Sequence, residues 1–184
     1  MKRFILALAA SLAIVPGVWA ENFKVDPAHT TLLFRVKHVD VSYSYGRINS
    51  PEGAFELNGD ELKSISVAAR PENVDTDNQK RDDHLRGPDF FNVKQFPDIT
   101  FKSTEITPAE GGWTVIGEFT MHGVTKPVTI ELKKTGEADH PQMGHRAGIE
   151  GSFSIKRSEF GMDKIVGPVG DDVDITVAIE GIKE

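Results

Sequence analysis

The chain has 184 residues, a formal net charge of −7 at pH 7 and no cysteine, and 39% of its residues are hydrophobic. This length suits one domain with a substantial hydrophobic core. The acidic balance argues against nucleic-acid binding and against strong attraction to anionic membranes, and the lack of cysteine excludes thiol catalysis and disulfide bonds.

The N-terminal residues predict export. Two basic residues precede an apolar run over residues 4–15, and Ala20 supplies the small residue that a signal peptidase requires. The run is shorter than the roughly 20 apolar residues that a membrane span needs. We therefore expect a signal peptide over residues 1–20, cleaved between Ala20 and Glu21.

The remaining residues, 21–184, are predicted to form a single domain. Its net charge would be −9, because two basic residues leave with the signal. Apolar and polar residues alternate along most of this region, which is typical of strands with one buried face. The pattern and its turn residues predict about eight strands, over residues 31–38, 46–57, 63–70, 99–104, 113–121, 128–133, 147–155 and 173–180.

One stretch differs from the strands. Residues 77–92 are mostly polar and charged, and Gly87-Pro88 interrupts them. We expect a short helix over residues 78–86, capped by Asp77, followed by a second turn near residues 89–92. This helical crossover would lie between strands as a connection or a lid.

Eight antiparallel strands with one polar face predict an all-β barrel, because closure hides every strand edge. A two-sheet sandwich is the alternative. An eight-stranded barrel can be filled by its own side chains or can hold one ligand. Gly117 and Gly151 fall on the predicted inward face, where they either leave room for a guest or relieve strand curvature.

The sequence lacks the usual local signatures of catalysis. The six histidines show no H-E-x-x-H pair or comparable metal-ligand spacing, and the chain contains no G-x-S-x-G elbow and no phosphate-binding glycine loop. We therefore predict no catalytic residue, no metal site and no cofactor, although distant residues can assemble a site.

Several segments together resemble the YceI-like family of polyisoprenoid-binding proteins over residues 23–182. The resemblance is carried by eight segments in the same order: 25–30 (VDPAHT), 34–38 (FRVKH), 74–76 (VDT), 81–86 (RDDHLR), 89–91 (DFF), 96–101 (FPDITF), 121–128 (MHGVTKPV) and 155–162 (IKRSEFGM). It implies a lipocalin-like barrel with a long isoprenoid or similar lipid along its axis, and a periplasmic location for exported members.

Beside this resemblance, the inward faces and the 78–92 crossover nominate ligand-binding residues. Five are phenylalanines on different strands, and Arg157 and His38 are candidates for a polar head group or for structural hydrogen-bond networks. The full set is Phe34, Val36, His38, Phe55, Val67, Leu85, Phe90, Phe91, Phe101, Phe119, Phe153, Ile155 and Arg157.

The expected partner is a long-chain isoprenoid or other apolar lipid, with no nucleic acid and no stable membrane insertion; a homodimer is left open. Two alternatives remain from the sequence. The first is an enzyme acting on a lipid-like substrate inside the barrel, with His38, His84 and Arg157 brought together in a polar pocket. The second is a non-binding interaction module with a solid interior.

Overall fold

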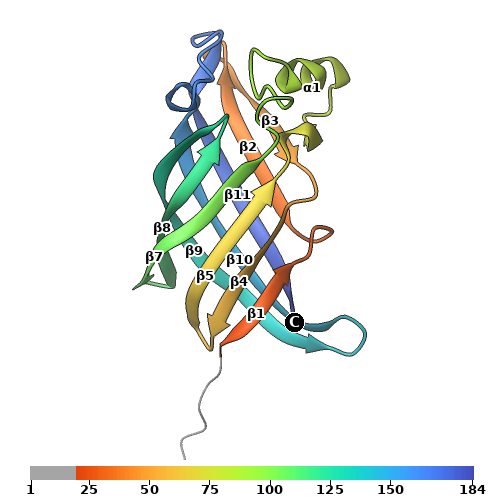
Figure 1. Cartoon of the computed structure of the whole chain (residues 1–184), viewed down its shortest axis with the longest axis vertical. Coiled ribbons are helices and arrows are strands. Elements are labelled where there is room, and N and C mark those ends of the chain that lie inside the picture. The colour runs from red at the N-terminus through yellow and green to blue at the C-terminus, as the bar shows by residue number, and fades with distance from the viewer. Residues whose placement is uncertain (1–19) are drawn as a thin grey trace, which may run out of the picture.

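The computed structural model describes residues 20–184, so the predicted signal peptide lies outside the described residues apart from Ala20. Within this part, eight antiparallel strands form a closed barrel (Figure 1). The ring consists of β1 (Glu21–Val25), β4 (Glu52–Asn58), β5 (Glu61–Ala69), β7 (Ile99–Ala109), β8 (Gly112–Met121), β9 (Val124–His140), β10 (Gly144–Lys156) and β11 (Val169–Lys183). The pairing of β11 with β1 closes the ring, which excludes the sandwich.

Three further strands extend the wall from β11 towards one end of the barrel: β2 (Thr31–His38), β3 (Ser42–Ile48) and the short β6 (Val74–Asp75). The helix α1 (Gln79–Arg86) lies at that end, which we call the α1 end (Figure 1). Two 3₁₀ turns complete the structure, η1 (Pro71–Asn73) and η2 (Arg157–Phe160). No helix of residues 20–184 is long and apolar enough to cross a lipid bilayer.

The strand inventory differs from the prediction in three places, one of which is the short β6, outside every predicted strand. The expected strand over residues 46–57 is two strands, β3 and β4, which join at Asn49-Ser50-Pro51. Ser50 has a left-handed backbone (φ 56°), and Pro51 has no N–H to donate, so a continuous ladder cannot pass through them. The short strand β1 was not predicted, although Phe23 and Val25 alternate with exposed residues there.

Several strands are longer than their apolar pattern, and β9 and β10 contain the exposed part of this excess. The alternation predicts strands over residues 128–133 and 147–155, whereas β9 has 17 residues and β10 has 13. The additional residues at the end of β9 and the start of β10 form a mostly exposed hairpin that projects beyond the barrel (Figure 1). Because both faces of this hairpin are polar, it lacks the period-two signal of a half-buried strand.

The helix occurs where it was expected, but its cap is one residue later. The side chain of Asn78 accepts a hydrogen bond from the main-chain N–H of Arg81 at 3.0 Å. Asp77, the predicted cap, has a left-handed backbone with φ 59° and precedes the cap position. A turn then follows, in which the N–H of Phe91 donates to the carbonyl of Leu85 at 2.9 Å.

The barrel interior away from α1 is filled by its own side chains. The rings of Phe23 and Phe55 stack there, with centroids 5.1 Å apart and 7° between their planes. Trp113, Val115 and Ile149 belong to the same buried core. We call these five residues the plug. Phe55 is 1% exposed, so its side chain packs against protein on all sides.

A partly buried ion-pair network connects three segments near the plug. Arg146 on β10 donates to the carboxylate of Asp26 at 2.8 Å and also to that of Glu180 on β11. The Asp26 carboxylate additionally accepts from the N–H of Ala28 and contacts His29 Nδ1 at 2.8 Å. These hydrogen bonds, first of all the one from Arg146, lower the pKa of Asp26 from 3.8 to about 2.

This network predicts a pH dependence of stability. Because the folded-state pKa of Asp26 is depressed, its contribution is present above the unfolded pKa of 3.8 and is lost as the pH falls through about 2. The shift corresponds to about 2 kcal/mol. Asp26→Asn is therefore expected to lower the free energy of unfolding by about 2 kcal/mol at pH 7. Denaturant titrations of both proteins should show this difference shrinking towards pH 2, and a constant difference would contradict the assignment.

Candidate ligand-binding cavity

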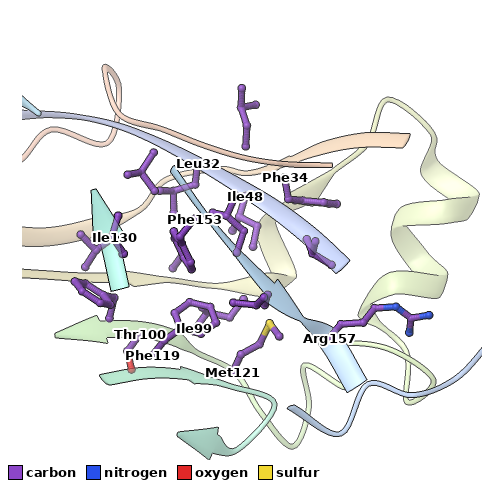
Figure 2. Close-up of a pocket in the computed structure, with 18 of the residues that line it drawn as sticks. Leu32, Phe34, Ile48, Ile99, Thr100, Phe119, Met121, Ile130, Phe153 and Arg157 are labelled. Carbon is purple, nitrogen blue, oxygen red and sulfur yellow. The ribbon is translucent and has the colours of Figure 1, made fainter. Parts of the chain in front are cut away.

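An apolar cavity occupies the barrel interior between the plug and α1 (Figure 2). Its empty space is about 1210 Å³, including the open mouth. Of the 27 residues of the described chain that line it, 25 have apolar side chains, and the two others are Thr100 and Arg157. Such a lining can hold a hydrocarbon chain but offers few partners for a polar substrate.

The strand alternation positions most of this lining. Phe153 on β10 and Ile175 on β11 are directly paired and face the interior together. Both are only partly buried although they point inwards, because the cavity leaves one side of each uncovered. The ring of Phe119 on β8 meets Phe153 edge-on, with centroids 5.6 Å apart. Aromatic edges and faces therefore line the middle of the cavity (Figure 2).

The mouth of the cavity lies at the α1 end. Leu85 on α1 and Phe90 and Phe91 in the following turn line it from one side, and Val36 and Val169 line it from the other. Leu85, Phe91, Val36 and Val169 are only partly buried, so the lining reaches the surface here. At the opposite end, the buried plug closes the barrel.

The charges of α1 hold the mouth together. Asp82 is 7% exposed and accepts hydrogen bonds from the N–H and the hydroxyl of Thr76. Arg81 donates to the Thr76 hydroxyl and carbonyl, and Arg86 donates to the carbonyls of Glu72 and Val74. These bonds fix α1 to β6 and so position Leu85.

The structure places eleven of the thirteen predicted ligand-binding residues on the cavity wall, and their contact with a ligand stays a prediction. These are Phe34, Val36, Val67, Leu85, Phe90, Phe91, Phe101, Phe119, Phe153, Ile155 and Arg157. Two lie elsewhere. Phe55 is part of the plug, and His38 is exposed at the last residue of β2, beyond the mouth.

Several wall residues were not nominated from the sequence. Ile65, Met121, Ile130, Val173, Ile175 and Val177 all line the cavity. Each lies on a predicted strand, and all except Met121 are aliphatic. Their alternation marked them as inward, but aliphatic residues fill a core as readily as they line a channel, so periodicity alone did not distinguish them.

The space beside the two inward-facing glycines is occupied by neighbouring protein atoms and is not available to a ligand. A Cβ at Gly117 would lie 2.4 Å from the ring of Phe101, a cavity-wall residue. A Cβ at Gly151 would lie 2.2 Å from the main-chain oxygen of Glu131 on β9. Neither glycine lines the cavity. A larger residue at Gly151 would therefore strain the pairing of β9 with β10 instead of obstructing the cavity.

Arg157 combines a place on the cavity wall with a structural role. It is 3% exposed, and its guanidinium donates to the main-chain carbonyls of Gly170, Met162, Lys164 and Val169, at 2.6–2.9 Å. The guanidinium points away from the apolar wall side chains in Figure 2. Burial lowers the pKa of the guanidinium, which nevertheless stays charged near neutral pH. Arg157 thus holds the segment between η2 and β11 together with the start of β11, and Met162 and Val169 in these two parts line the cavity.

This arrangement predicts that a conservative substitution is not tolerated. Arg157→Lys keeps the charge, but one ammonium group cannot reach carbonyls spread around a planar guanidinium. We expect a loss of about 2 kcal/mol in the free energy of unfolding, because buried carbonyls lose their donors. Limited proteolysis should also cleave the segment at residues 161–168 faster. Unchanged stability and cleavage would show that these hydrogen bonds contribute little.

The structure does not assemble the predicted enzyme site. His38 is exposed, and His84 pairs with Asp89 on the surface, with an Nε2–Oδ2 distance of 3.3 Å. Arg157 is buried and directed towards main-chain carbonyls. These three side chains therefore do not meet in a polar pocket, and the geometric basis of the enzyme alternative is lost.

Two groups of side chains in the described chain have ligand atoms close enough to hold a metal ion. In the first, Asp26 and Glu180 already bind Arg146, whose positive charge takes the place that a cation would need. In the second, Glu137 pairs with Lys134 and Glu21 pairs with Lys183. Their carboxylates are thus engaged by protein cations.

Comparisons with known proteins agree with this geometry. The sequence matches the YceI-like domain over residues 23–181. A relative from Yersinia pestis (strain Pestoides F), named UPF0312 protein, is 37% identical over 182 residues, which cover 97% of this chain and 95% of the relative.

Solved structures show the same fold. Burkholderia cenocepacia BcnA superposes with a TM-score of 0.77 at 22% identity, covering 85% of this chain and 98% of that chain. A domain from Saccharophagus degradans, described as polyisoprenoid binding, gives a TM-score of 0.67 at 10% identity, covering 88% and 98%. The match to nearly the whole described chain, together with the barrel and its apolar cavity, shows that this protein belongs to the YceI-like family.

Proposed function

We propose that this protein is a periplasmic carrier that holds one long apolar lipid, a polyisoprenoid or a similar chain, in its barrel cavity. The observation that carries the proposal is the cavity, whose lining is apolar at 25 of 27 positions and whose mouth opens beside α1. The shared fold with a domain described as polyisoprenoid binding supports the ligand class. The predicted signal peptide supports the location. The proposed role is binding without a catalytic step.

Energetics favour reversible transfer over irreversible capture. Burying one CH₂ group contributes about 0.8 kcal/mol, so a five-carbon unit gains roughly 4 kcal/mol relative to water. A membrane interior offers nearly the same apolar surroundings. The free energy of moving the lipid from a membrane into the cavity is therefore small, which suits a protein that takes up and releases its ligand.

Native mass spectrometry tests this function. The full chain would be expressed in a Gram-negative host and purified from the periplasm without detergent. We expect a mass increment of one long-chain lipid per chain, released by organic solvent, and an N-terminus at Glu21. Protein that is repeatedly empty would contradict the carrier role, and protein that stays in the cytoplasm with its N-terminal residues attached would contradict the location.

A further inference from the structure

Apolar side chains gather on the surface beside the cavity mouth. Val39 and Val41 lie at the tip of the β2–β3 hairpin and are 50% and 82% exposed, and Ile165 and Val166 in the segment before β11 are 51% and 45% exposed. We call these four residues the rim. Both segments lie at the α1 end (Figure 1), and the N–H of Val39 donates to the carbonyl of Pro168 at 2.8 Å.

Two of the rim residues have a strained backbone conformation. Val39 and Ile165 have left-handed conformations, with φ of 44° and 48°. β-branched residues are disfavoured there because the side chain clashes with its own backbone, and such strain gathers at functional sites. Asparagine would adopt this conformation with less strain and would be more soluble. The sequence thus places strained, apolar residues where relaxed, polar ones would fit.

Tyrosines and basic groups lie directly behind the rim. Tyr43 and Tyr45 on the outer face of β3 are 45% and 60% exposed. Lys37 Nζ lies 4.8 Å from the centroid of the Tyr43 ring, and the guanidinium of Arg35, which also donates to the carboxylate of Asp174 at 2.8 Å, lies 4.5 Å from it. This arrangement matches the layers of a membrane surface. Apolar side chains favour its interior, tyrosine favours the headgroup level and basic groups favour the phosphates.

We propose that the rim docks the cavity mouth onto the surface of a phospholipid bilayer. This inference rests on the proposed function, since a ligand that is insoluble in water has to be taken from a membrane and returned to one. The rim continues into the mouth, because Val169, which follows the Ile165 segment, lines the cavity. Docking is peripheral: the rim inserts a few side chains to the depth of the headgroups, and the lipid passes between bilayer and cavity without crossing water.

The test uses a variant that removes the apolar rim while relieving its strain. Val39→Asn with Ile165→Asn is expected to leave the melting temperature unchanged or higher, because asparagine tolerates the left-handed backbone. Binding to phosphatidylcholine vesicles, measured by co-flotation, should fall about tenfold or more, since burial of the rim drives it. Met143→Asn is the matched control. Met143 is 38% exposed at the tip of the β9–β10 hairpin, far from α1, and its replacement should leave vesicle binding unchanged.

The outcomes separate this inference from the carrier role. When lipid is supplied in detergent instead of in a membrane, the double variant should bind as much lipid as the wild type, because neither Val39 nor Ile165 lines the cavity. Wild-type protein that carries lipid but does not float with vesicles would overturn docking alone. Equal vesicle binding by wild type and double variant would overturn it as well. A wild-type dimer that the double variant converts to a monomer in sedimentation, without vesicle binding, would assign the rim to a second copy of the chain and overturn the proposal.

Discussion

Replacing Phe55 with alanine is expected to lower the free energy of unfolding by about 3–5 kcal/mol, because it removes a fully buried ring and leaves a hole in the plug. Phe55 is 1% exposed and stacks on Phe23. The measurement is equilibrium denaturation of lipid-free protein, in which a loss below about 2 kcal/mol would show that the plug is loosely packed.

The matched variant is Phe153→Ala, which removes the same ring from the cavity wall. Phe153 is only partly buried, and the space beside it is already empty, so little new cavity is created. We expect a loss of about 1–2 kcal/mol in lipid-free protein. Equal losses in the free energy of unfolding for Phe55→Ala and Phe153→Ala would contradict a barrel that has a cavity at one end and a packed core at the other.

Val67→Trp is expected to abolish lipid binding while leaving a folded barrel. Val67 on β5 lines the cavity and is only partly buried, so the indole can occupy the space that the lipid would use. We expect lipid per chain to fall more than about tenfold, because each displaced CH₂ contributes about 0.8 kcal/mol to binding. Lipid extraction beside circular dichroism measures both quantities.

The control is the same substitution in the plug. Val115 is 0% exposed on β8, and a tryptophan there has no space to enter. Overpacking is expected to cost about 3 kcal/mol, whereas Val67→Trp should cost far less. A folded Val67→Trp protein with undiminished lipid would show that the ligand lies elsewhere.

The closed barrel could be predicted from the sequence because alternation marks which residues face inwards. Seven of the eight predicted strands occur where the pattern places them, although several are longer. The split at Asn49-Ser50-Pro51 and the extended β9–β10 hairpin were missed, because a bend and a polar hairpin leave no period-two signal.

Position along the barrel axis could not be predicted in the same way. Phe55 and Phe153 both point inwards, but one belongs to the plug and the other to the cavity wall. The period of two predicts whether a side chain points into or out of the barrel. It does not predict whether the barrel interior at that height is packed with side chains or left as a cavity. His38 was misplaced for a related reason, since its strand ends beyond the mouth.

The motifs that carried the family resemblance include structural residues whose hydrogen-bond partners the sequence did not reveal. Asp26 binds Arg146, which is 120 positions away in the chain. Arg157 binds carbonyls of an irregular segment, for which there is no periodic signal. Partners of this kind come from tertiary contacts between segments that no local pattern links.

Photo-crosslinking locates the ligand most directly. An isoprenoid alcohol with a diazirine near the end of its tail would be loaded into the protein, irradiated, and its adducts mapped by peptide mass spectrometry. The account predicts adducts on cavity-wall residues of β10 and β11, such as Phe153 and Val177, with Val67→Trp removing them. Adducts confined to the outer face of the barrel, or unchanged in Val67→Trp, would contradict the binding of a lipid inside it.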